Sequence, residues 1–151
     1  MSFQEKNSTV SLVNFILILG FFLVRLFQMI QGGGFIPANV FRLWGIIIAL
    51  AIVVTIFATI LTHIVSAIIQ VIKTGQEQSN VEDIEDERDQ LIDLRGTKIT
   101  YLVYSIGNFL AMLTFVFGQP PLVMFTLLIL SGVVAQIIGD ISRLYLYRRG
   151  F

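Results

Sequence analysis

Four long apolar stretches, with only one extended charged segment between them, limit most strongly what this chain can fold into. The stretches cover about residues 10–31, 42–73, 98–118 and 121–147. A helix of about 20 mostly apolar residues crosses the hydrocarbon core of a bilayer. The pattern therefore predicts four membrane-spanning helices in a single membrane domain over residues 1–151.

The composition agrees with this prediction. Hydrophobic residues make up 56% of the chain and charged residues 13%, whereas a soluble domain carries about 25% charged residues. The mean hydropathy is +0.85. We therefore expect an all-α fold, an integral membrane four-helix bundle, whose first apolar stretch is too long for a signal-peptide core and is retained.

The composition argues against several function classes. The net charge is zero and no strong basic patch occurs, which argues against nucleic acid as a partner. The absence of cysteine excludes disulfides, thiolate metal sites and cysteine nucleophiles. The single histidine leaves no His-Glu-x-x-His motif or catalytic triad within reach, so we expect no enzyme, no cofactor and no metal site.

Basic residues predict the orientation in the membrane. Glycines at 32–34 with Pro37, and the sequence at 118–121, indicate two short turns with no lysine or arginine. Because basic residues favour the cytoplasmic side, we expect both termini in the cytoplasm and a location in the cytoplasmic membrane. The basic residues near the opposite helix ends are Lys73, Arg88, Arg95, Lys98, Arg143, Arg148 and Arg149.

The charged segment, residues 76–97, holds eight of the ten acidic residues. Ser79 and Glu82 fit a capping box, and apolar residues then recur at helical spacing. This predicts a short cytoplasmic amphipathic acidic helix between the second and third spans, which leads directly into the third span and bends near Gly96. Disorder is the competing prediction for residues 74–80. A solvated or protein-docking face is favoured over a cation site, because acidic residues around a helix seldom converge on one ion. The predicted partner-binding residues are Glu82, Asp86, Arg88, Asp89, Ile92 and Asp93.

Polar residues within the spans form a second group of candidates, because such residues are costly in lipid. Asp140 and Arg143 are three residues apart and are predicted to pair on one helix. His63 could titrate near neutral pH, although a role in helix packing is the commoner one. The buried amides either join helices by hydrogen bonds or line a polar cavity, and the pattern leaves both readings open. The intramembrane polar candidates are Arg25, Thr55, Thr59, His63, Asn108, Gln136 and Asp140.

Small residues recur every four positions on the fourth apolar stretch, at Ser131, Ala135 and Gly139. Such residues let helix backbones approach closely in lipid. They indicate packing within the bundle or, alternatively, a homodimer face.

The stretch 86–98, Asp-Glu-Arg-Asp-Gln-Leu-Ile-Asp-Leu-Arg-Gly-Thr-Lys, followed by Ile99 and Tyr101, resembles a group of small prokaryotic four-helix membrane proteins of unknown function. In that group an Asp-Glu-Arg-Asp-x-x-Ile-like segment leads into a membrane helix. The resemblance covers about the second half of the chain. It implies that Asp86, Arg88, Asp89 and Ile92 form a functional or folding unit at the cytoplasmic boundary, and it implies an accessory or regulatory character without a specific activity.

Together these features favour a non-enzymatic membrane protein that acts as an accessory, regulatory or assembly component through its cytoplasmic acidic helix. The alternative is a small oligomeric transporter or channel that uses the polar stripe of the second span, around Thr55, Thr59 and His63. A structural subunit of a larger membrane complex is a third reading.

Overall fold

The computed structural model, which describes residues 3–74 and 87–149, consists of four long helices in these ranges, with no strand among them. All four are long and apolar enough to cross a membrane. This confirms the predicted all-α fold and its four candidate membrane spans. The helices are α1 (Phe3–Gln31), α2 (Pro37–Thr74), α3 (Glu87–Val116) and α4 (Pro121–Arg149).

Both tight turns close their helix in the same way. Gly33 and Gly118 have φ angles of 66° and 81°, a conformation that a residue without a Cβ adopts at little cost. The residue after each glycine donates its N–H to a carbonyl of the preceding last turn, at 2.9 Å after Gly33 and 3.0 Å after Gly118. A proline then begins α2 and α4, at the helix position where a missing N–H costs least.

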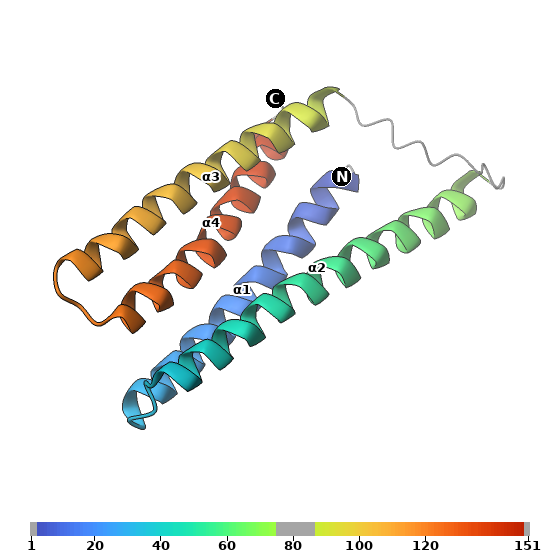
Figure 1. The fold of residues 1–151 in the computed structure, drawn as a ribbon. Coiled ribbons are helices and arrows are strands. Elements are labelled where there is room, and N and C mark those ends of the chain that lie inside the picture. The colour runs from blue at the N-terminus through green and yellow to red at the C-terminus, as the bar shows by residue number, and fades with distance from the viewer. Residues whose placement is uncertain (1–2, 75–86, 150–151) are drawn as a thin grey trace.

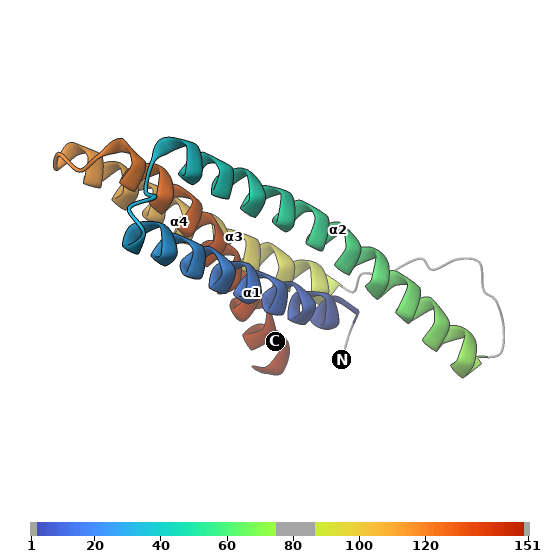
Figure 2. The ribbon, with the colours of Figure 1, turned by 90° about the horizontal axis from the view of Figure 1, so that it is seen from below.

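The helices lie side by side in the order α2, α1, α4, α3 (Figure 1). α3 packs extensively on α4, α4 also packs on α1, and α1 packs on α2. The chain termini and the helix ends at Thr74 and Glu87 lie at one end, which we call the terminal end. The two tight turns, residues 32–36 and 117–120, lie at the other, which we call the turn end. The C-terminal part of α2 extends beyond the other helices (Figures 1 and 2).

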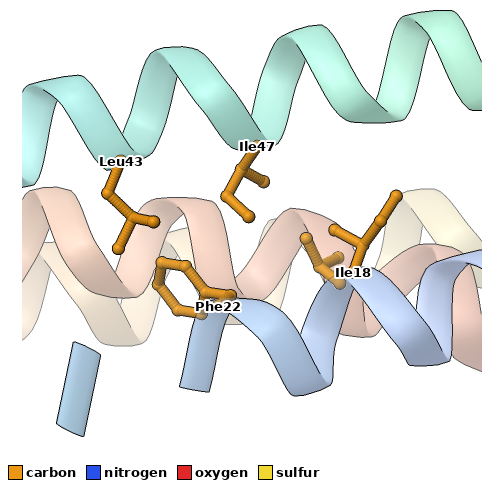
Figure 3. Close-up of a cluster of buried hydrophobic side chains, with 5 residues drawn as sticks. Ile18, Phe22, Leu43 and Ile47 are labelled. Carbon is orange, nitrogen blue, oxygen red and sulfur yellow. The ribbon is translucent and has the colours of Figure 1, made fainter. Parts of the chain in front are cut away.

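The buried apolar cluster lies where α1, α2 and α4 meet. Ile18 and Phe22 of α1 point toward Leu43 and Ile47 of α2 (Figure 3), and Val133 of α4 completes the cluster. Each of these side chains is at most 6% exposed. This contact holds the α1–α2 pair on the α3–α4 pair.

Most other large apolar side chains point outward. Phe57 on α2 is 69% exposed and Phe109 on α3 is 62% exposed, and similar residues follow along both edge helices. Surfaces of this kind would be unstable in water and match the hydrocarbon of a bilayer. The exposure pattern therefore agrees with a multi-pass membrane protein.

The described half of the acidic segment, residues 87–97, is the first part of α3 and leads directly into the third apolar stretch. α3 begins at Glu87 and continues without interruption through Gly96 to Val116. Glu87 and Asp89 lie in its first turn, where acidic side chains interact favourably with the helix dipole. The predicted capping box at Ser79 and Glu82 lies outside the described residues.

Candidate functional site: a polar pocket at the terminal end

Asp140 is the acidic residue of α4, and only 3% of its side chain is exposed. Its Oδ2 accepts a hydrogen bond from the Ser11 hydroxyl of α1 at 2.6 Å. Its Oδ1 accepts from Gln136 Nε2 at 3.3 Å and pairs with Arg143 Nη1 at 3.0 Å. The ion pair predicted from the three-residue spacing is therefore present, and it carries an additional bond to another helix.

Arg143 extends this network from α4 to α3. Its Nε pairs with Asp93 Oδ1 at 2.8 Å, and its Nη2 donates to the Thr97 hydroxyl at 2.8 Å. The stem of Arg143 lies against Gly96, where a Cβ would overlap it. Each of the three guanidinium nitrogens thus has an acceptor, although only 13% of the side chain is exposed.

The network joins three helices at the terminal end. Removing charges from water costs several kcal/mol per ion unless they are paired and hydrogen-bonded. Within the described residues, every buried side-chain nitrogen and oxygen has a hydrogen-bond partner. The cluster of Ser11, Asp93, Thr97, Asp140 and Arg143, which we call the polar network, therefore holds α1, α3 and α4 together without leaving a buried charge unpaired.

A pocket of about 220 Å³ opens beside the polar network. α2 contributes Thr55 and Thr59 to its wall, so all four helices contribute to it. Among the lining residues that the structure describes, Phe15 is the apolar one. The remaining lining residues are Asn7, Ser8, Ser11, Asn14, Asp93, Gln136, Asp140 and Arg143. The volume is smaller than that of a typical drug-sized site, about 300–1,000 Å³, and suits water or a small polar ligand.

The described lining residues of the pocket include carboxylate and hydroxyl oxygens that can accept hydrogen bonds. Among these lining residues, the charged groups are two carboxylates, Asp93 and Asp140, and one guanidinium, Arg143, and their formal charges sum to −1. The guanidinium nitrogens are already bonded, and the Thr59 hydroxyl donates to the Thr55 carbonyl at 2.9 Å. Carboxylate and hydroxyl oxygens keep lone pairs for a further ligand. In the described part of the chain, no group of three or more His, Asp or Glu lies together as a metal site would require.

The predicted partner-binding residues have different surroundings. Ile92 is completely buried and Asp93 pairs with Arg143, so both lie toward α4. Arg88 Nη2 lies 3.4 Å from the Tyr147 carbonyl of α4, to which it donates. Asp89 is partly exposed. Glu82 and Asp86 lie outside the described residues.

The intramembrane polar candidates separate into two groups. Thr55, Thr59, Gln136 and Asp140 meet at the pocket, which the sequence could not establish. The others lie elsewhere: Arg25 lies near the turn end, Asn108 accepts a hydrogen bond from the Ser131 hydroxyl at 3.0 Å, and His63 lies in α2 at a position whose side chain is outside the described part.

The small residues of α4 face α3. A Cβ on Gly139 would overlap the Thr100 hydroxyl, and Ser131 lies against Gly107. Ala135, between them, is 1% exposed. This face is occupied within a single chain, so a homodimer through it would require α3 to move away. The dimer stays a prediction.

Sequence reasoning missed Ser11 and Thr97, the partners of Asp140 and Arg143 on other helices. Ser11 is 129 residues from Asp140 in the sequence. A signal was available, because Asn7, Ser11 and Asn14 recur at helical spacing on α1 and all line the pocket. A polar row on an otherwise apolar span indicates a side that faces protein rather than lipid.

Comparison of the chain with protein-family models, with curated proteins and with solved structures found no match. The resemblance of residues 86–98 to small prokaryotic membrane proteins stays a prediction.

Proposed function

We propose that this chain is a non-enzymatic multi-pass protein of the cytoplasmic membrane that works as an accessory, regulatory or assembly component. Both termini lie in the cytoplasm, and the acidic segment, residues 76–97, is the contact surface for a basic protein partner. The observation that supports this proposal is the position of the acidic residues. All those described lie in helix parts near the terminal end: Glu5, Glu87, Asp89, Asp93 and Asp140.

Two acidic residues suit a test of the contact surface. Glu87 is exposed and Asp89 partly exposed, whereas Asp93 is engaged with Arg143. Charge complementarity governs the encounter of such surfaces. Glu87 and Asp89 should therefore be changed together, and Asp93 left unchanged.

The experiment is native mass spectrometry of the tagged protein extracted gently from its own membranes. A defined heteromeric mass is expected, and the partner should be lost from the Glu87→Lys/Asp89→Lys variant. The uncharged Glu87→Gln/Asp89→Asn variant should retain an intermediate amount, because it removes attraction without adding repulsion. Equal recovery from all three folded proteins would contradict the proposal.

A second function, a small oligomeric transporter or channel, is supported by the pocket. Thr55 and Thr59 belong to the polar stripe on which the sequence-based alternative rested, and they line the same space as Asp140. A polar cavity among membrane helices is where translocated solutes bind.

Flux into proteoliposomes tests this alternative. The Thr55→Val/Thr59→Val variant keeps the side-chain shape and removes both hydroxyls, so flux should fall by about tenfold or more. Thr114→Val is the matched control, since its hydroxyl bonds to the Ala111 carbonyl near the turn end. No flux of any solute across a broad panel would contradict the transporter reading.

A further inference from the structure

A second pocket, of about 480 Å³, lies near the turn end between α1 and α2. It is separate from the polar network, which lies near the terminal end. Arg25 of α1 and Arg42 of α2 both line it, and both side chains are exposed. We call it the arginine pocket.

Among the residues that the structure describes, no carboxylate lines the pocket beside these two arginines. The sequence has no acidic residue between Glu5 and Glu77, and none between Asp93 and Asp140. The contacts of Arg25 are with neutral groups: Nη1 lies 3.4 Å from the Gln28 side-chain oxygen, and the guanidinium lies 5.6 Å from the centre of the Phe21 ring. The arginine pocket therefore has a formal charge of +2 from its lining residues.

The two arginines lie at similar depth. Arg25 is six residues before the end of α1 at Gln31, and Arg42 is five residues after the start of α2 at Pro37. At 1.5 Å per residue, both are about 8–9 Å inside their helix ends. A guanidinium at this depth is costly unless it reaches the interface or a counter-charge.

The rest of the pocket wall is apolar on the side away from the turn. Phe21, Leu43 and Ile46 line it, and the outward faces of both helices continue as exposed apolar surface, for example at Leu17 and Val53. The pocket thus combines two cationic side chains with an adjoining apolar wall. This combination matches an amphiphile with an anionic head and a hydrocarbon tail. Guanidinium groups bind phosphate oxygens through two parallel hydrogen bonds.

We propose that the arginine pocket binds an anionic phospholipid, with the headgroup phosphate between Arg25 and Arg42 and an acyl chain along the apolar faces of α1 and α2. This inference goes beyond the accessory function and does not depend on it. It also explains why two basic residues lie at the end of the molecule that the distribution of lysine and arginine assigns to the outside.

The test is native mass spectrometry of the full chain in detergent with phosphatidylglycerol or phosphatidylcholine added at equal concentration. The unchanged protein should retain phosphatidylglycerol about tenfold better. The Arg25→Gln/Arg42→Gln variant should lose this preference. The matched control, Arg148→Gln/Arg149→Gln, removes the same charge near the terminal end and should keep it.

Two further arms separate the possible outcomes. Inorganic phosphate should not displace the lipid at equal concentration, because it lacks the acyl chain; displacement would overturn the assignment to a lipid. The Arg25→Lys/Arg42→Lys variant keeps the charge without the planar guanidinium, so it should keep part of the preference for phosphatidylglycerol. If the glutamine variant does not fold, this lysine variant is the test, and an undiminished preference in it would count against binding by the two guanidinium groups. Equal retention of the two lipids by the unchanged protein, or a preference that survives in a folded glutamine variant, would overturn the proposal.

Discussion

Asp140 is the residue on which contacts from three helices depend. Its carboxylate binds Ser11 of α1 directly, and through Arg143 it is connected to Asp93 of α3. The two carboxylates around Arg143 differ in exposure, since 3% of the Asp140 side chain and 63% of the Asp93 side chain are accessible. Their contributions to stability should differ accordingly.

Replacing Asp140 with asparagine should lower the free energy of unfolding by about 3 kcal/mol, because Arg143 would lose its buried counter-charge. Replacing Asp93 with asparagine makes the same chemical change at the exposed partner and should cost less than about 1 kcal/mol. Reversible unfolding in mixed micelles, followed by circular dichroism, measures both. Equal decreases in the free energy of unfolding would show that the Asp140–Arg143 pair does not stabilise the fold more than the Asp93–Arg143 pair.

The α3–α4 contact depends on small residues placed opposite larger ones. Gly96 faces Arg143, Thr100 faces Gly139, and Gly107 faces Ser131. From one pair to the next, the residue number rises on α3 by nearly as much as it falls on α4. The two helices are therefore antiparallel and keep the same register along the whole contact. In lipid, where apolar burial does not drive association, such close approach is a main source of stability.

Gly139→Ala should destabilise the α3–α4 contact by about 1–3 kcal/mol, because the new methyl group would overlap the Thr100 hydroxyl. Adding Thr100→Ala should restore part of this loss, giving a favourable coupling in a double-mutant cycle. Unfolding measurements on the two single variants and the double variant give the coupling.

The matched control for this cycle is Gly45→Ala in α2, where an added Cβ has no neighbour within 4 Å. It should be neutral or slightly stabilising, since alanine favours a helix by up to about 1 kcal/mol over glycine. An equal loss at both glycines would mean that backbone effects, rather than the contact with Thr100, account for the result.

At the scale of the whole molecule, the two ends of the helix bundle contain different parts of the chain. The termini, with the adjoining ends of α2 and α3, lie at one end and both tight turns at the other (Figure 1). If the four helices cross the bilayer, each end belongs to one side of the membrane. From the distribution of lysine and arginine, we propose that the terminal end lies in the cytoplasm.

Single cysteines can test this arrangement directly, because the natural chain has none. Lys6→Cys and Arg149→Cys should be protected from a membrane-impermeant maleimide in intact cells and labelled in inverted vesicles. Gln31→Cys and Gln119→Cys, at exposed positions near the turn end, should show the opposite pattern. Labelling of Lys6→Cys and Gln31→Cys from the same side would contradict a membrane-spanning α1.

Features encoded locally along the chain could be predicted from the sequence. The four long helices follow from apolar length, the two turns from Gly33, Gly118 and the prolines that follow them, and the Asp140–Arg143 pair from a three-residue spacing. Each depends on residues within a few positions of one another. The start of α3 could not be predicted in the same way. The charged residues before position 98 do not show whether the helix begins there, with the apolar stretch, or earlier, at Glu87, where the structure has it.

The tertiary structure alone decided which side of each helix meets which neighbour. Spans that are apolar on nearly all sides carry little periodicity, so their rotation and order cannot be obtained from hydropathy. That is why Ser11 meets Asp140, why Thr55 and Thr59 line the same pocket, and why Arg25 and Arg42 share another. The amino-acid sequence by itself determined four candidate membrane spans and a local ion pair, and only the packing of the helices brought polar residues together in two separate pockets.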